Sequence, residues 1–141
     1  MKNSTDKTYI DQSAEVRSMI DKENDMIHYR ITWLTTLQGL LFAALGFVWG
    51  QTTGTPLIKL LSSLGIVFSI IIFVALIAAT NAMNRLIDWW DENKPDDYNG
   101  PGVVGLHPPE NKIGRNIGFY LWVPVVFIVA WGIVWVIILK Q

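Results

Sequence analysis

The chain contains no cysteine. Disulfide bonds, thiolate catalysis and thiolate metal ligation are therefore excluded. Only 16% of its 141 residues are charged, against about 25% in soluble domains. The net charge of −1 leaves no basic excess to neutralise phosphates, so no nucleic-acid partner is expected. The first thirty residues are polar, and a cleaved secretory signal peptide is not expected either.

Charge is absent from three long windows. No charged residue lies between Arg30 and Lys59, between Lys59 and Arg85, or between Arg115 and Lys140. A helix needs roughly 20 mostly apolar residues to cross a hydrocarbon core of about 30 Å, and each window meets that requirement. The sequence therefore predicts an all-α membrane protein with three transmembrane helices.

The first two helices are expected to extend beyond the membrane into the cytoplasm. No Pro or Gly separates the amphipathic stretch at 11–30 from the first apolar window, so one helix is predicted over 11–50. At 1.5 Å per residue it would be about 60 Å long, twice the hydrocarbon thickness. The other expected segments are a flexible tail at 1–10, a second span with its extension at 57–93, a cytoplasmic loop at 94–115 and a third span at 116–139, with Pro124 as a candidate kink.

The distribution of Lys and Arg predicts the orientation. Nine of the eleven lie before the first span or between the second and third spans, and only Lys59 and Lys140 lie on the other side. Cytoplasmic flanks carry the excess of Lys and Arg, so the amino terminus is predicted inside and the carboxyl terminus outside. Trp33 and Trp49 agree with the first span, because interfacial tryptophans would bracket it about 24 Å apart.

A stripe of small residues marks one face of the first span: Gly39, Ala43, Gly46 and Gly50. Small faces let membrane helices approach closely, because lipid offers no hydrophobic driving force between them. Two interpretations follow. The stripe forms a self-association seam between subunits, or it packs on the second or third span within one subunit.

A polar cluster is predicted near the inner ends of the first two spans, formed by Thr35, Gln38, Asn81 and Asn84. Antiparallel neighbours would bring Gln38 near Asn81. Polar groups in lipid need partners. The cluster either lines a hydrated passage or ligand cleft, or serves as hydrogen-bonding contact between helices.

A cytoplasmic collar is predicted just below the spans, formed by His28, Arg30, Arg85 and Asp88. If both helices continue below the membrane, Arg30 can meet Asp88. The collar either transmits a signal from the cytoplasmic region into the spans, or consists of ordinary snorkelling side chains and surface ion pairs.

No catalytic motif is found in the sequence. There is no serine elbow, no phosphate-cradling glycine loop and no carboxylate pair inside a span. His107 with Glu110 is a weak metal candidate, because His28 is the only other histidine and lies far away in sequence. We therefore expect no enzyme activity, no cofactor and no metal. The absence of acids and bases within the spans also argues against a proton-coupled transporter.

One stretch carries a family resemblance: Arg30-Ile-Thr-Trp-Leu-Thr-Thr-Leu-Gln-Gly-Leu-Leu-Phe-Ala-Ala-Leu-Gly46. It resembles the first span of small uncharacterised bacterial inner-membrane proteins, in which an Arg-x-x-Trp run leads into a Gln-Gly-Leu-Leu-Phe-Ala segment. The resemblance implies a multi-pass protein of the bacterial inner membrane. Some small membrane proteins of this build are phage-defence effectors that oligomerise and compromise the membrane.

Three functions are compatible with the sequence. The first is a homo-oligomeric membrane effector or pore. The second is a scaffold or accessory subunit that recruits a cytoplasmic protein through residues 11–30 and 84–115. The third, a transporter or membrane enzyme subunit, is disfavoured by the lack of charge within the spans. The expected partners are therefore the lipid bilayer, further copies of the chain and a cytoplasmic protein.

Overall fold

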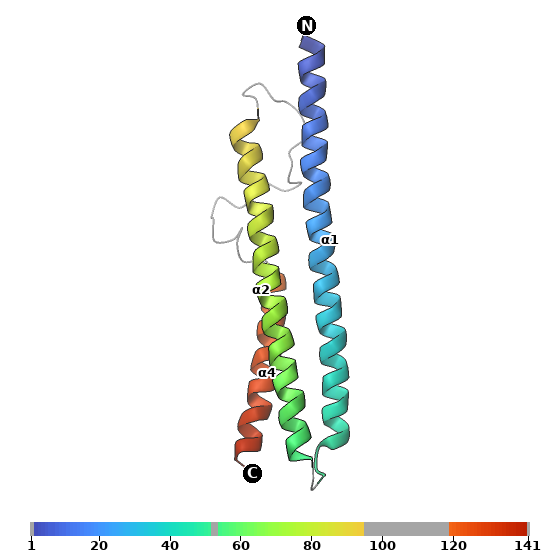
Figure 1. Cartoon of the computed structure of the whole chain (residues 1–141), viewed down its shortest axis with the longest axis vertical. Helices are drawn as coiled ribbons and strands as arrows, with labels where there is room; N and C mark the ends of the chain where they lie inside the picture. The colour runs from blue at the N-terminus through green and yellow to red at the C-terminus, as the bar shows by residue number, and fades with distance from the viewer. Residues whose placement is uncertain (1, 52–53, 95–118, 141) are drawn as a thin grey trace. The chain divides into compact units, whose positions relative to one another are not determined.

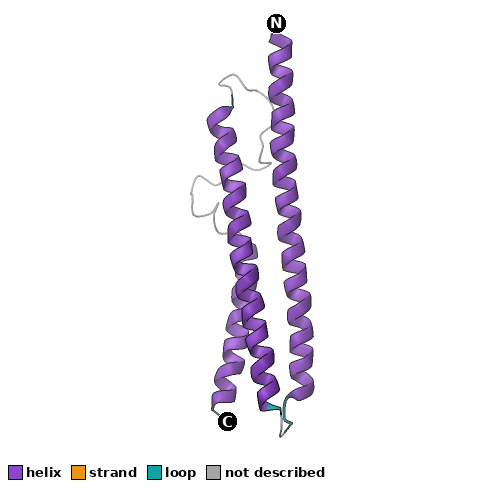
Figure 2. Cartoon of the chain, viewed as in Figure 1, coloured by secondary structure: helices purple, strands orange, loops and turns teal. Residues whose placement is uncertain are grey.

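The computed structural model describes residues 2–51, 54–94 and 119–140, all of them in helices or in the turns beside them. The helices are α1 (Lys2–Val48), α2 (Thr55–Asn93), the short 3-10 helix η1 (Phe119–Leu121) and α4 (Trp122–Leu139) (Figure 1). No strand occurs among these residues (Figure 2). Three of the helices contain stretches long and apolar enough to cross a membrane: Asp11–Val48, Thr55–Asn93 and Trp122–Leu139. The expected all-α class and the three apolar helices are confirmed.

Helix α1 begins at Lys2, within the segment expected to be a flexible tail. That expectation is corrected for a local reason. Residues 2–10 contain neither Pro nor Gly, and adding residues to an existing helix is much easier than nucleating a new one. The polar composition of the tail therefore does not end the helix.

A tight turn joins α1 to α2. Gly50 has φ +86°, the left-handed conformation that commonly terminates helices and that glycine adopts without a steric penalty. The Gln51 side chain donates to the carbonyl oxygen of Phe47 at 2.9 Å and so satisfies one carbonyl of the last helical turn. Pro56 lies in the first turn of α2, where its missing N–H has no intrahelical partner to lose. Gly50 thus ends α1, and Pro56 is compatible with the start of α2.

Helix α4 begins later than the predicted third span. Trp122 is its first residue, and residues 116–118 lie outside the described part of the chain. Pro124 therefore belongs to the first turn, where proline is tolerated, instead of one or two turns inside the helix. The expectation of a proline kink does not apply at this position. The expected loop at 94–115 also lies outside the described residues after Lys94, together with His107 and Glu110.

The chain divides into two compact units, and α1 and α2 each contribute to both. The three-helix unit comprises residues 28–77 and 118–141, and the two-helix unit comprises residues 1–27 and 78–117. The core of the three-helix unit consists of Leu45, Ile58, Leu61, Trp131, Val134 and Ile138. The core of the two-helix unit is smaller and consists of Val16, Ile20 and Trp90, with Met83 and Ile87 packed against it.

Candidate functional site

The small-residue stripe of α1 faces outward from the three-helix unit. Gly39, Ala43 and Gly46 are all exposed. A Cβ added at Gly39 or Gly46 would meet no atom within 4 Å. The interpretation that this face packs on another span of the same subunit is therefore wrong. Gly50 belongs to the turn after Val48, so the helical part of the stripe is Gly39, Ala43 and Gly46.

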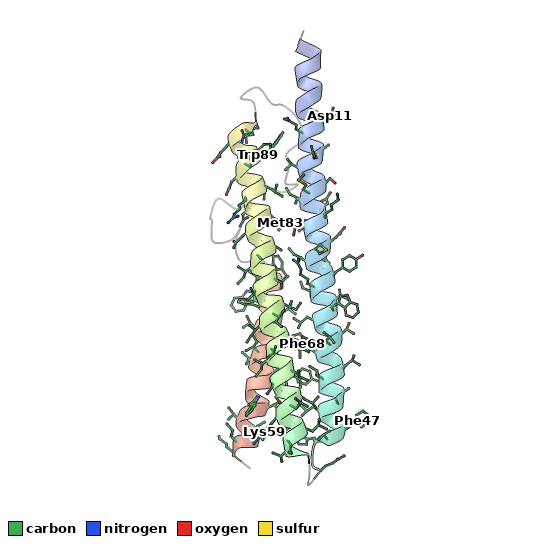
Figure 3. The ribbon with its side chains drawn as sticks, in the orientation of Figure 1. Asp11, Phe47, Lys59, Phe68, Met83 and Trp89 are labelled. Atoms are coloured by element: carbon green, nitrogen blue, oxygen red, sulfur yellow. The ribbon has the colours of Figure 1, made fainter. Side chains whose placement is uncertain are left out.

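Large apolar side chains accompany the small ones on the outer surface of α1. Leu40 and Phe47 are both exposed, and Figure 3 shows Phe47 projecting away from the ribbon of α2. They follow Gly39 and Gly46 directly in the sequence. The outward surface of α1 thus combines protruding apolar side chains with small residues, the pattern that lets a facing helix interdigitate.

The small-residue face that the chain buries lies on α2. Ser62, Gly65 and Ser69 are buried at helical spacings of three and four residues. The hydroxyls of Ser62 and Ser69 donate to backbone carbonyls one turn earlier, at 2.8 Å, so both hydroxyl hydrogens are paired. The sequence-based prediction did not include this face, although small residues recur on α2 at the same helical spacings as on α1.

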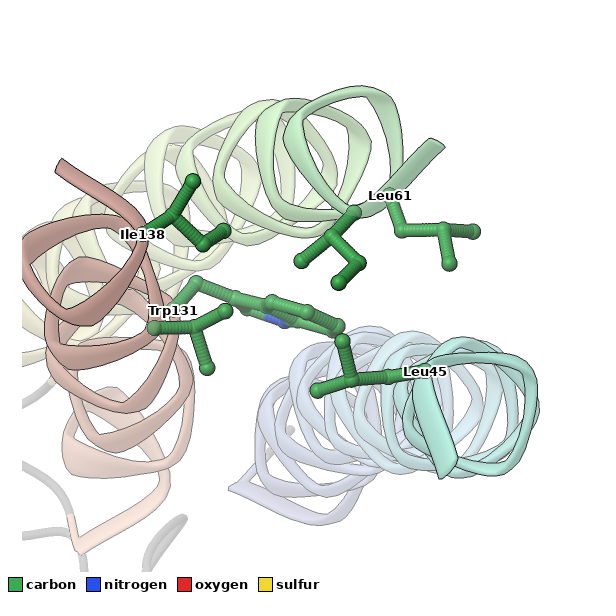
Figure 4. Packing of buried hydrophobic residues seen from close by; sticks show 6 residues of the cluster. Leu45, Leu61, Trp131 and Ile138 are labelled. Carbon is green, nitrogen blue, oxygen red and sulfur yellow. The ribbon is translucent and has the colours of Figure 1, made fainter. Parts of the chain in front are cut away.

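Trp131 of α4 inserts into the space that this small face leaves. Its side chain is 0% exposed, and a Cβ on Gly65 would overlap its indole ring. The ring stacks on Phe42 of α1 with a centroid separation of 4.4 Å and an interplanar angle of 6°. Figure 4 shows the indole reaching from α4 to Leu45 of α1, and Leu61 of α2 belongs to the same buried cluster. Gln38, Phe42 and Gly65 form what we call the Trp131 slot.

Gln38 links all three helices of this unit through hydrogen bonds. The indole Nε1 of Trp131 donates to its Oε1 at 2.6 Å. Its own Nε2 donates to the carbonyl oxygen of Gly65 and to the hydroxyl of Ser69, each at 2.9 Å. Both amide hydrogens and the amide oxygen are therefore satisfied in a site with 0% exposure. A buried polar group of this kind is tolerated because its hydrogen bonds are complete.

The partners of Gln38 differ from Asn81, the neighbour expected from the sequence. The turn near residue 51 explains the difference. In a helical hairpin with a short turn, residues equally distant from the turn lie opposite each other, which pairs Gln38 with Gly65. Thr35, another member of the predicted cluster, is exposed on α1. Asn81 and Asn84 belong to the two-helix unit, where Asn81 is exposed and Asn84 is half-buried.

The predicted collar residues are likewise divided between the units. His28 and Arg30 belong to the three-helix unit, whereas Arg85 and Asp88 belong to the two-helix unit. The guanidinium Nη1 of Arg30 donates to the carbonyl oxygen of Ala75 at 3.4 Å. This contact again joins residues at similar distances from the turn. The ion pair of Arg30 with Asp88 stays a prediction.

No protein-family model, no curated protein and no solved structure matches this chain. Within the described ranges, no three His, Asp or Glu side chains gather closely enough to hold a metal ion. The described part of the chain offers three features that bear on function: the outward small-residue stripe of α1, the interior Trp131 slot and the two-helix unit.

Proposed function

We propose that this chain is a non-enzymatic, multi-pass protein of the bacterial inner membrane that self-associates through α1 and acts as a membrane-perturbing or pore-forming effector. The observation that carries the proposal is the outward position of Gly39, Ala43 and Gly46, which have no packing partner within the described part of the subunit. Helices in lipid associate by close packing of such faces.

The internal packing of the three-helix unit supports this assignment. The subunit already has a small-residue face for its own assembly, built from Ser62, Gly65 and Ser69 of α2. The stripe on α1 is therefore not needed to hold the subunit together. A second subunit that placed its α1 against the first would bury the stripe with Leu40 and Phe47 beside it.

Substitutions in the stripe are expected to weaken self-association. Gly46→Leu and Gly39→Leu place bulky side chains where a facing helix would approach. The dissociation constant of the oligomer should therefore rise at least tenfold, which weakens the free energy of association by about 1.4 kcal/mol. The mass of the purified protein in detergent measures the oligomer. Growth arrest and dye leakage after overexpression measure the effect on the membrane.

Gly132→Leu is the matched control, because a Cβ at Gly132 of α4 also meets no atom within 4 Å and lies outside the stripe. It should leave both the mass and the leakage unchanged. The proposal would be contradicted if the wild-type protein had the mass of a monomer in detergent, or if leakage persisted in both stripe variants. A stable oligomer without leakage would support self-association through the stripe and contradict the membrane-perturbing function.

The orientation belongs to the same proposal, with the amino terminus in the cytoplasm. It rests on the nine Lys and Arg residues placed on one side against two on the other. The cysteine-free chain allows a direct check with single cysteines at Ser4 and Lys140. In intact cells, a membrane-impermeant thiol reagent should label Lys140→Cys and spare Ser4→Cys. The reverse labelling pattern would overturn the orientation.

The two-helix unit favours a second candidate function, that of a scaffold for a cytoplasmic protein. This unit has its own core around Trp90, while Met19, Met26 and Trp89 remain exposed. Exposed apolar side chains on a formed surface are typical of protein interaction sites. A monomer in detergent that copurifies with a defined cytoplasmic protein, and releases it when Met19 and Trp89 are changed to Ser, would favour this function over the effector.

A further inference from the structure

The charged residues of the three-helix unit are all cationic. Residues 28–77 and 118–141 contain Arg30, Lys59 and Lys140 and no Asp or Glu. Arginine stays protonated at every physiological pH, and a charge near apolar surroundings needs a counter-charge or strong hydrogen bonds. For these cations, no side-chain carboxylate of the same unit can supply the counter-charge.

Arg30 is the least solvated of the three. It is half-buried, whereas Lys59 and Lys140 are exposed. Its contact with the carbonyl oxygen of Ala75 is 3.4 Å long, beyond the usual range of about 2.7–3.2 Å. A neutral carbonyl at this distance occupies one of five N–H donors. The remaining donors are suited to an anionic oxygen ligand.

Two exposed aromatic side chains flank Arg30 on α1. Tyr29 is 66% exposed and Trp33 is 65% exposed. Tyr and Trp in membrane helices concentrate at the level of the lipid headgroups. Arg30 lies about 4.5 Å from Trp33 along the helix axis, on the side away from the apolar window. With α1 inserted as proposed above, this places the guanidinium at the depth of the lipid phosphates.

We propose that Arg30, together with Tyr29 and Trp33, forms a binding site for the phosphate group of an anionic phospholipid. The planar guanidinium can donate two parallel hydrogen bonds to phosphate oxygens. The exposed apolar side chains of Ile71 and Val74, which precede Ala75 on α2, provide surface for the acyl chains. The inference rests on the membrane insertion that is part of the proposed function, and it is independent of self-association.

Native mass spectrometry of the full chain in detergent, titrated with phosphatidylglycerol or phosphatidylcholine, tests the site. Wild-type protein should retain phosphatidylglycerol preferentially. Arg30→Gln should weaken this binding about tenfold, which corresponds to about 1.4 kcal/mol. Arg30→Lys should weaken it less, because lysine keeps the charge but loses the bidentate geometry. Lys140→Gln is the matched control and should bind as wild type does.

Several outcomes would overturn the site. These are equal binding of the two lipids, an Arg30→Gln protein that binds as tightly as wild type, and an equal loss in Lys140→Gln. Displacement of the lipid by excess inorganic phosphate would mean that the site takes the free ion, and it would reject the phospholipid as ligand. If Arg30→Gln fails to fold, Trp33→Ala and Arg30→Lys decide, and both should bind phosphatidylglycerol several-fold more weakly.

A separate measurement distinguishes this inference from the proposed function. Wild-type protein reconstituted with vesicles of phosphatidylcholine alone is floated on a density gradient. Protein that does not float with the vesicles contradicts membrane insertion itself, and both proposals then fail. Protein that floats, yet shows no preference for phosphatidylglycerol in the titration, contradicts the phosphate site alone.

Discussion

Trp131→Ala is expected to lower the free energy of unfolding of the three-helix unit by about 3–5 kcal/mol, the range for removing a fully buried large aromatic side chain. The indole is completely buried, stacks on Phe42 and donates to Gln38. Its removal leaves a cavity between three helices and an unpaired amide oxygen. Denaturant titration in mixed micelles measures the loss.

Two further variants separate the contributions that the ring and the N–H group of the indole make to the free energy of unfolding. Trp131→Phe keeps an aromatic ring in the slot but removes the N–H donor, and it should cost about 1 kcal/mol, in line with interhelical hydrogen bonds in membranes. Trp122→Ala removes an exposed tryptophan from the same helix and should change the stability far less. Equal losses of unfolding free energy for Trp131→Ala and Trp122→Ala would contradict the packing of Trp131 in the slot.

Gly65→Ala is expected to destabilise the same unit by about 1–3 kcal/mol, although alanine normally favours a helix over glycine. The added methyl group would overlap the indole of Trp131. The indole cannot move aside freely, because its ring stacks on Phe42 and its nitrogen is bonded to Gln38. The same titration detects the change, and the indole N–H resonance of Trp131 should shift as the bond to Gln38 is distorted.

Gly132→Ala is the control for this substitution, because a Cβ at Gly132 meets open space. It should be neutral or stabilising by up to about 1 kcal/mol. The decisive comparison is Gly65→Ala in the Trp131→Ala background, where the indole that the added methyl group would overlap is absent. There the cost should disappear, since residues in direct contact have non-additive effects. A cost that persists in the double variant would contradict the contact.

Both predictions depend on the interior of the three-helix unit, and the proposed function depends on its surface. Variants of Gly65 or Trp131 should lower the stability of the subunit, whereas variants of Gly39 or Gly46 should alter assembly with little change in subunit stability. Arg30 variants should alter lipid binding in a protein that stays folded.

The amino-acid sequence by itself determined the number of apolar helices and the turn between the first two. Those features depend on local properties. A charge-free window of sufficient length is apolar whatever its neighbours are. Gly50 ends the first helix, and Pro56 suits the start of the second, through their own backbone constraints. The sequence also indicated that Gln38 needs a partner, because an amide within an apolar helix must be satisfied.

Only the tertiary structure decided which faces point inward. The spacing of Gly39, Ala43 and Gly46 on α1 resembles that of Ser62, Gly65 and Ser69 on α2, yet the first set is exposed and the second is buried. In a soluble protein the polarity of the opposite face would separate the two cases. Lipid is as apolar as a protein interior, so hydrophobicity does not distinguish them. The choice depends on the fit of Trp131 against Gly65 and on its bond to Gln38, contacts between distant parts of the sequence that exist only once the three helices have packed.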